Sequence, residues 1–299
     1  MNFRFDSLVT LYAVHPLRQL GSSHDSSIPI LMYHSICDEA ETGVHPYYRT
    51  STSPQQFALQ MAYLHESGYQ TASLAEVVSQ LQRPESGSDK RVVITFDDGY
   101  RDFHRHAFPV LSQYGFSATV FLPTAYIGES SLTFKGKECL GWAEVRQLHE
   151  RGISFGSHTV THPQLRELSV AAVNEEITNS RKTIEEKLGC AVDSFAYPYA
   201  FPQTDIDFKK KLRDSLREAG YKNGVCTIVG RARRDSDPFF LERLPVNSAD
   251  DGALFQAKLA GAYDWVAGFQ YASKMVKACF RSPAGGVKYP VSKDFPAVQ

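Results

Sequence analysis

Short apolar runs alternate along the chain with segments in which apolar residues recur every three or four positions. The first pattern predicts buried strands, and the second predicts helices with one face on a core. The runs expected to form strands are 28–34, 92–96, 117–123, 154–158, 194–198, 224–229 and 239–246. Buried strands that alternate with amphipathic helices form a mostly parallel sheet covered by helices. About seven such units in 299 residues favour an α/β barrel over an open sheet.

Three segments show the helical period clearly. The segment that contains Val173 and Leu188 begins after Ser169, a residue suited to capping a helix N-terminus. It ends at Gly189, a residue suited to stopping a helix. The periodic apolar residues are Phe57, Met61 and Leu64, then Val173, Ile177, Ile184 and Leu188, then Phe208, Leu212 and Leu216.

A single domain is the simplest organisation. We expect an N-terminal extension over 1–27, a barrel over 28–250, and a C-terminal helix and tail packing on the barrel over 251–299. The formal net charge of -1 argues against a nucleic-acid partner. The five cysteines are scattered and never in C-x-x-C spacing, which disfavours a disulfide framework or a cysteine zinc site and fits a reducing compartment.

The N-terminal segment carries no clear export signal, and no stretch is apolar for the roughly 20 residues that span a bilayer. Leu8, Leu11, Tyr12 and Leu17 share one face of a helix, which packs on the domain in the favoured interpretation. Peripheral contact with a membrane is the alternative. We therefore expect a protein of the cytoplasm or of the inner-membrane periphery; its oligomeric state is not indicated.

Chemically capable residues end four of the predicted strands. His34 ends the first, Asp97 and Asp98 follow the second, His158 ends the fourth, and the fifth runs into Tyr199. In parallel α/β folds the reactive groups gather at the carboxyl ends of strands, so these side chains are expected on one face of the barrel.

The stretch "SHTVTH" places His158 and His162 four residues apart, on one face if the local backbone is helical. H-x-x-x-H alone is a weak signal, but two imidazoles with a strand-end carboxylate form a ligand set that leaves positions open for water and substrate. Asp97-Asp98-Gly also suits an ordinary turn. If the carboxylates of Asp97 and Asp98 point into a cleft, a cation is needed to offset their mutual repulsion. One carboxylate can then bind the cation while the other acts as general base.

"TFDDG" (95–99) followed by "HTVTH" (158–162) resembles the first two motifs of the polysaccharide deacetylases of carbohydrate esterase family 4, the NodB-homology domain, over roughly 28–246. The resemblance implies a distorted (β/α)7 barrel that removes N-acetyl groups from a glycan with a bound metal ion. Motif matching makes Asp97 the general base and Asp98, His158 and His162 the ligands. The ligand types indicate a divalent ion, with Zn²⁺ the first choice before Co²⁺, Ni²⁺, Fe²⁺ or Mn²⁺.

The third motif of that family, R-x-P-Y/F, corresponds to "AYPYA" (196–200). Pro198 and Tyr199 match as substrate-binding residues, and the Tyr199 N–H would help to bind the oxyanion. Ala196 replaces the arginine that orients the catalytic aspartate in the family. Arg243, near another strand end, is the candidate substitute; a structural arginine is the alternative reading. Trp142 flanks the same cleft or packs in the core.

The general acid also departs from the usual family arrangement, because no histidine follows His162. His34 ends the first strand and is the candidate, in an order similar to that of the poly-N-acetylglucosamine deacetylase subgroup; a structural histidine is the alternative. Two other functions stay open: a metal-dependent hydrolase of small amides, and a catalytically silent carbohydrate-binding homologue.

Overall fold

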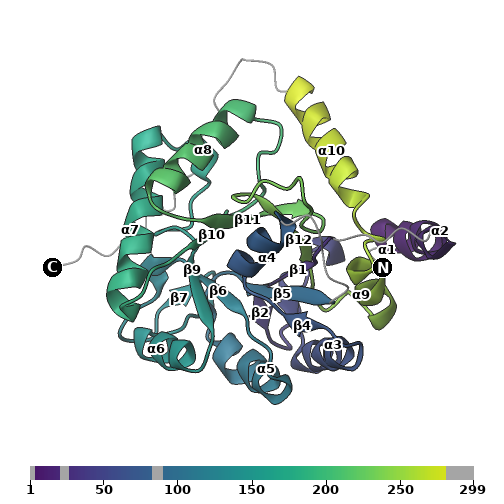
Figure 1. Cartoon of the computed structure of the whole chain (residues 1–299), viewed down its shortest axis with the longest axis horizontal. Helices are drawn as coiled ribbons and strands as arrows, with labels where there is room; N and C mark the ends of the chain where they lie inside the picture. The colour runs from purple at the N-terminus through teal and green to yellow at the C-terminus, as the bar shows by residue number, and fades with distance from the viewer. Residues whose placement is uncertain (1–3, 21–26, 83–89, 281–299) are drawn as a thin grey trace.

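A closed ring of parallel strands forms the centre of the molecule. The computed structural model describes residues 4–20, 27–82 and 90–280. Seven strands form the ring in the order β1-β12-β11-β10-β9-β6-β5, and pairing of β1 with β5 closes it (Figure 1). Their bounds are β1 Ile30–Tyr33, β5 Arg91–Phe96, β6 Thr119–Leu122, β9 Ser154–Ser157, β10 Ser194–Ala196, β11 Asn223–Val229 and β12 Leu241–Pro245.

Each of these strands lies within or beside a run identified from the sequence, so the expected seven-stranded barrel of a single domain is confirmed. The sequence did not reveal the short strands. β4 (Gln70–Thr71) pairs with the start of β5, β2 (Ser35–Ile36) pairs with β3 (Ser51–Thr52), and β7 (Thr133–Phe134) forms a hairpin with β8 (Lys137–Glu138). All are too short to produce a readable alternation of apolar and polar residues.

Helices surround the ring. They are α3 Pro54–Glu66, α5 Phe108–Tyr114, α6 Trp142–Glu150, α7 Val170–Leu188, α8 Ile206–Glu218, α9 Gly252–Leu259 and α10 Val266–Phe280. Helix α7 has the predicted ends, because the Ser169 hydroxyl accepts a hydrogen bond from the Ala172 N–H and Gly189 adopts φ 70°.

One end of the barrel is closed by α4 (Leu74–Leu81), which lies across the ring in Figure 1. Its Leu74, Val77 and Leu81 pack against inward-facing strand residues such as Ile30 and Val93. Because these residues come early in their strands, α4 covers the amino ends and leaves the carboxyl ends for the polar residues. Side chains alternate along a strand, so the inward face that holds Val93 also holds Thr95 and Asp97.

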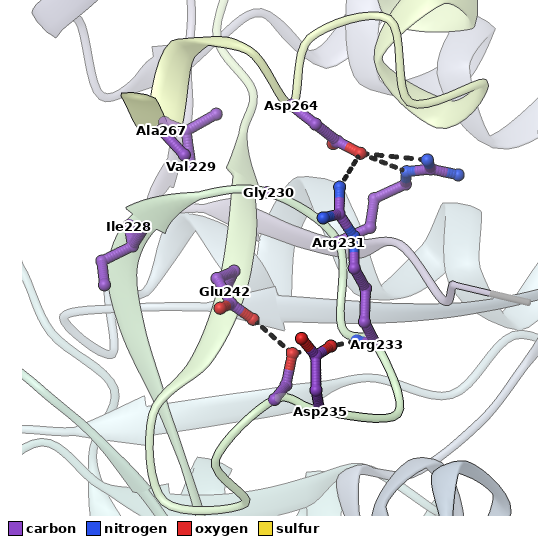
Figure 2. Close-up of a pocket in the computed structure, with 10 residues that line it drawn as sticks. Ile228, Val229, Gly230, Arg231, Arg233, Asp235, Glu242, Asp264 and Ala267 are labelled. Carbon is purple, nitrogen blue, oxygen red and sulfur yellow. Dashed lines mark hydrogen bonds and ion pairs between the residues drawn. The ribbon is translucent and has the colours of Figure 1, made fainter. Parts of the chain in front are cut away.

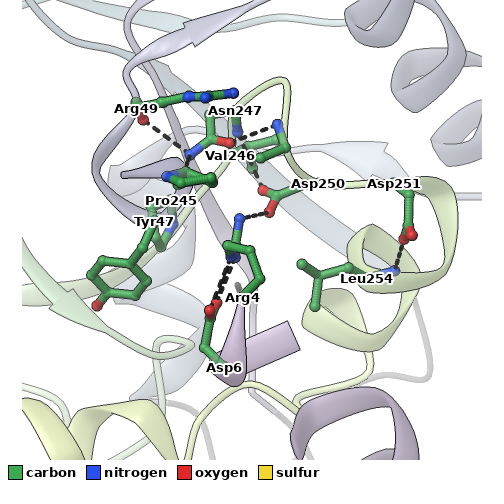
Figure 3. A network of polar contacts seen from close by, with 12 residues as sticks. Arg4, Asp6, Tyr47, Arg49, Pro245, Val246, Asn247, Asp250, Asp251 and Leu254 are labelled. Carbon is green, nitrogen blue, oxygen red and sulfur yellow. Dashed lines mark hydrogen bonds and ion pairs between the residues drawn. The ribbon is translucent and has the colours of Figure 1, made fainter. Parts of the chain in front are cut away.

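The N-terminal segment forms α1 (Phe5–Val9), the π-helical turn η1 (Thr10–Val14) and α2 (His15–Leu20). It packs on the domain through polar contacts, as Figure 3 shows: the Arg4 guanidinium pairs with Asp6 and, at 3.3 Å, with Asp250. Asp250 in turn pairs with the buried Lys258 at 2.6 Å.

The apolar face expected to pack on the domain is instead largely exposed, which corrects that expectation: Leu8, Tyr12 and Leu17 are 43%, 78% and 69% exposed, and Leu11 is half-buried. Contact of this face with a membrane stays a prediction. Among the described residues no helix is long and apolar enough to cross a bilayer. The expected C-terminal tail, 281–299, lies outside the described residues.

The barrel interior leaves no room for a side chain at position 156. A Cβ on Gly156 would lie 2.5 Å from the Phe121 ring and 2.8 Å from the Ser194 carbonyl oxygen. We expect Gly156→Ala to lower the free energy of unfolding by about 1–3 kcal/mol, because overpacking shifts the backbone. Gly252→Ala, where a Cβ meets nothing within 4 Å, is the control and should leave stability unchanged or raised. Equal urea midpoints for both variants would contradict this packing.

Candidate active site

The carboxyl ends of five barrel strands bring the predicted site residues to one end of the barrel. His34 follows β1, Asp97 and Asp98 follow β5, and His158 follows β9. Tyr199 lies three residues beyond β10, and Arg243 is within β12. The predicted site residues therefore lie at the carboxyl end of the barrel, as expected from their positions at strand ends.

Asp98, His158 and His162 form a compact buried cluster. The Asp98 Oδ1 atom lies 3.6 Å from His158 Nε2 and 3.3 Å from His162 Nε2. One ligand atom from each residue falls within 4.8 Å of the others. Bonds of about 2.0–2.1 Å to a tetrahedral zinc separate its ligand atoms by roughly 3.3 Å, so the cluster has the spacing of a metal site.

The hydrogen bonds around the cluster leave its ligand atoms available. His158 Nδ1 lies 2.8 Å from the Ala196 carbonyl oxygen, which can only accept, so Nδ1 carries the proton and Nε2 a lone pair. Asp98 Oδ2 accepts a hydrogen bond of 3.0 Å from the Tyr100 hydroxyl. Asp98 Oδ1 is buried and has no hydrogen-bond partner among the described residues. An orphaned carboxylate oxygen facing two imidazole nitrogens fits a bound cation.

The protonation states fit the same role. Burial lowers the pKa of both His158 and His162, so each is a neutral imidazole near pH 7. Burial alone would raise the pKa of Asp98, but interactions with His34 and Lys135 hold that pKa below its ordinary value. Two neutral imidazoles and one carboxylate are the protonation states that bind a divalent ion.

The backbone between the two histidines is not helical, which corrects the expectation drawn from their spacing. Residues 158–162 form a turn in which Thr159 and His162 adopt φ 69° and φ 56°. The imidazole rings still meet, with centroids 4.6 Å apart. The turn brings them together because left-handed backbone at two positions reverses the chain within five residues.

Backbone strain concentrates at this end of the barrel. Within the described part of the chain, the non-glycine residues with positive φ are Asp98, Lys135, Thr159, His162 and Tyr199. Asp98 and His162 belong to the cluster, and Thr159 follows His158. Lys135 lies 3.5 Å from Asp98, and the Tyr199 ring lies 4.5 Å from the ring of His162. Such residues cost on the order of 1–3 kcal/mol each and persist where the surroundings enforce them, typically at functional sites.

Asp97 is held by a buried, two-pronged ion pair with Arg243. Nη1 and Nη2 of Arg243 donate to Oδ1 and Oδ2 of Asp97, each at 2.7 Å, and both side chains are buried. Arg243 also donates to the Cys226 carbonyl and the Thr95 hydroxyl. Burial alone would raise the pKa of Asp97, but the charge of Arg243 outweighs it and holds that pKa well below its ordinary range. The arginine absent from position 196 thus has a spatial counterpart on β12.

His34 and Tyr199 lie at the rim of the same site. His34 Nε2 is 3.9 Å from Asp97 Oδ2, and its side chain is 19% exposed. Pro198 is buried, whereas Tyr199 is 46% exposed. The Tyr199 N–H donates no hydrogen bond to any residue that the structure describes. The site therefore combines a buried floor with a donor and a titratable group at its opening.

Trp142 does not reach this opening. It begins α6, is 3% exposed and belongs to the hydrophobic core, so its ring is not available to stack on a sugar. Trp142 therefore packs in the core, which was the alternative to a place beside the cleft.

Two residues that contact Asp98 were not predicted from the sequence. One is Tyr100, whose place two residues after Asp98 was a usable signal. The other is Lys135 at the tip of the β7–β8 hairpin, whose Nζ lies 3.5 Å from Asp98 Oδ2. Nothing in the stretch "TFKGKE" indicates that the hairpin folds toward the site, because that contact depends on tertiary packing.

A separate pocket of about 150 Å³ lies beside β11 and β12 and shares no residue with the cluster (Figure 2). Asp264 pairs with Arg231 and Arg233 in this pocket, and Glu242 accepts a hydrogen bond from the Ser236 hydroxyl. This arrangement offers no set of convergent reactive groups.

Comparison with known proteins agrees with this fold. The family model described as polysaccharide deacetylase matches residues 85–224. YxkH of Bacillus subtilis, which bears a polysaccharide deacetylase name, is 31% identical over 232 residues, 78% of this chain and 76% of its own. The chain therefore belongs to the polysaccharide deacetylase family.

Two further relatives extend the comparison. The poly-beta-1,6-N-acetyl-D-glucosamine N-deacetylase of Staphylococcus aureus is 23% identical over 206 residues, covering 66% of this chain and 68% of its own. The solved structure of the Streptococcus pyogenes deacetylase PplD in complex with acetate superposes with a TM-score of 0.68 at 25% identity, covering 78% of this chain and 98% of its own. The barrel is thus the fold of solved deacetylases.

Loss of one ligand should weaken metal binding strongly. We expect Asp98→Ala and His162→Ala to weaken Zn²⁺ binding by more than about 100-fold, because two ligands do not replace three. His106→Ala removes an exposed histidine and should leave affinity unchanged. Chelator competition and elemental analysis measure both. An Asp98→Ala protein that keeps a full complement of ion would show that the cluster is not the metal site.

Breaking the buried Asp97–Arg243 ion pair should lower the stability of the protein. We expect Arg243→Met to lower the free energy of unfolding by about 3–5 kcal/mol at pH 7, because a buried carboxylate loses its partner. Arg105→Met removes an exposed pair with Glu138 and should cost less than about 1 kcal/mol.

The cost of Arg243→Met should also depend on pH. The pKa of Asp97 is depressed in the folded protein, so its stabilising contribution is present above the ordinary carboxyl pKa of about 4 and is lost as pH falls toward the depressed value. Chemical denaturation at pH 7 and pH 3.5 should show the difference between wild type and Arg243→Met narrowing at the lower pH. A constant difference would contradict an ionised, arginine-held Asp97.

Proposed function

We propose that this protein removes N-acetyl groups from an N-acetylated glycan of the N-acetylglucosamine type by metal-dependent hydrolysis. The observation that carries the proposal is the convergence of three metal-ligand residues with an arginine-held carboxylate and a rim histidine. The name of the S. aureus relative supports this substrate class. The ligand types favour Zn²⁺, with Co²⁺, Ni²⁺, Fe²⁺ and Mn²⁺ as the other ions they accept.

Asp98, His158 and His162 would hold the ion. A divalent ion in that place lowers the pKa of a water molecule and polarises a carbonyl oxygen. The single carboxylate supplies one negative charge, so a bound divalent ion would keep a net positive charge and could still lower the pKa of a water molecule. Tyr100 fixes the carboxylate by its hydrogen bond to Oδ2, which leaves Oδ1 directed at the imidazoles.

Asp97 acts as general base in this proposal. The two terminal nitrogens of the Arg243 guanidinium donate to the two carboxylate oxygens of Asp97, which fixes the orientation of the carboxylate plane. The same charge makes Asp97 a weak base, so proton transfer to Asp97 requires a water molecule that has already been made more acidic. The pairing therefore secures an ionised, oriented carboxylate at the expense of basicity.

Tyr199 and His34 complete the reaction at the rim. The Tyr199 N–H donates to the oxyanion that forms when water attacks the acetamide carbon. His34, protonated, gives its proton to the departing sugar nitrogen, and the C–N bond breaks to release acetate and a free amine. His34 is the acid in this scheme because it is the histidine beside Asp97 that is not assigned to the metal cluster.

Replacing His34 should separate chemistry from metal binding. We expect His34→Ala to retain its metal ion and to lose about 10²–10⁴-fold in kcat, the usual contribution of a general acid. His65→Ala, at an exposed site on α3, is the control and should keep wild-type turnover. The assay is acetate release from N-acetylglucosamine oligomers. Full turnover by His34→Ala would remove His34 from the mechanism.

The same assay tests the competing functions. Acetate release from small amides but not from oligomers would indicate a small-amide hydrolase. Oligomer binding without acetate release by the metal-loaded protein would indicate a silent carbohydrate-binding homologue.

A further inference from the structure

The turn that joins the two histidines is held from outside by one carboxylate. Glu176, on α7, accepts hydrogen bonds from the Val160 N–H at 2.7 Å and the Thr161 N–H at 2.9 Å through Oε2. Its Oε1 accepts a third from the Thr161 hydroxyl at 2.6 Å. A single helical side chain thus satisfies two consecutive backbone donors between His158 and His162.

This turn needs support because its backbone is strained. Thr159 and His162 adopt positive φ, and for a β-branched threonine that conformation is a genuine outlier. Inside the turn, the Thr159 hydroxyl accepts a hydrogen bond of 2.9 Å from the His162 N–H. The amides of Thr124 and Ala125 also donate to the carbonyls of Thr159 and Val160 at 3.1 and 2.9 Å. The turn is therefore held by Glu176 of α7 and by the segment after β6.

The helix that carries Glu176 is fixed to the strand that carries His158. One turn further along α7, the Ser180 hydroxyl lies 2.6 Å from the Ser157 hydroxyl, and both side chains are buried. Ile177 of the same face is also buried in the core. Glu176 consequently projects from a rigid support, and its reach to the turn does not rely on a flexible loop.

We propose that Glu176 is a positioning residue for the metal site: it sets the distance and orientation of His158 and His162 through the backbone of the turn between them. The proposal rests on the proposed function for the ion, because it assigns His158 and His162 as its ligands. Glu176 contacts neither imidazole in the hydrogen bonds described. Its influence therefore acts through Val160 and Thr161.

The hydrogen-bond geometry predicts an order among substitutions. Gln keeps the length of the side chain, so its single oxygen can accept from both amides while its NH₂ group donates to the Thr161 oxygen. Asp keeps the negative charge but is one methylene shorter and falls out of reach. If Glu176 works by positioning, Glu176→Gln retains more function than Glu176→Asp. If it works only by charge near the ion, the order reverses.

The experiment compares Glu176→Gln, Glu176→Asp and Glu176→Ala with Glu175→Ala, which removes the exposed neighbouring carboxylate on the same helix. The first readout is amide hydrogen exchange over 158–162 in the metal-free protein. We expect faster exchange at Val160 and Thr161 in Glu176→Ala and Glu176→Asp, little change in Glu176→Gln, and none in Glu175→Ala. Unchanged exchange in Glu176→Ala would overturn the proposal.

The second readout is Zn²⁺ affinity by chelator competition, together with the visible absorption of the Co²⁺ form, which reports ligand geometry. We expect affinity to fall by about 10–100-fold in Glu176→Ala and Glu176→Asp, and less in Glu176→Gln. Equal affinity in all variants, or a tighter site in Glu176→Asp than in Glu176→Gln, would overturn the positioning role.

Failure of the proposed function gives a different result. In that case the wild-type protein itself binds no ion at the cluster, whereas the exchange measurement on metal-free protein still decides whether Glu176 holds the turn. Glu176→Gln is the mildest change and keeps the comparison interpretable if Glu176→Ala does not fold.

Discussion

Two adjacent carboxylates buried at the end of β5 are the constraint on which the site depends. Like charges this close remain ionised only if each has a positive partner, since a buried carboxylate without one would take up a proton instead. Asp97 has the guanidinium of Arg243, which occupies both of its oxygens. Lys135 lies 3.5 Å from Oδ2 of Asp98. The other oxygen of Asp98, Oδ1, lies beside two imidazoles and has no hydrogen-bond partner among the described residues. Arg243 thus neutralises Asp97, whereas the unpartnered Oδ1 of Asp98 leaves a place that a cation could fill.

The barrel makes this arrangement possible because alternate residues of parallel strands face its interior. Residues near the strand starts are apolar and pack on α4, whereas Asp97 and Arg243 come later on the same inward faces. Closing the amino end with a helix gives the carboxyl end a dry floor, which strengthens the electrostatic interactions above it. The left-handed turns at Asp98, His162 and Tyr199 then direct side chains and one backbone donor over that floor.

The sequence was sufficient to predict the seven barrel strands and the residues at their ends, because buried strands and strand-end polar groups both leave local patterns. It also identified Arg243 from its position near a strand end, although Ala196 stands where the motif has arginine. It did not predict the turn geometry at 158–162, because H-x-x-x-H spacing is compatible with a helix and the left-handed backbone at Thr159 has no local signature. The sequence also did not predict that Trp142 is buried, that Lys135 approaches Asp98 or that Glu176 reaches the turn, since each of these depends on how distant elements pack.

Under the proposed function, deacetylation depends on an ion held by Asp98, His158 and His162. The most direct measurement is acetate release from N-acetylglucosamine oligomers by protein stripped of metal with a chelator, followed during stepwise return of Zn²⁺. We expect no acetate release from the stripped protein, and a rate that rises with added Zn²⁺ and levels off at a single bound ion per chain. Acetate release at the full rate by protein shown to hold no ion would contradict it.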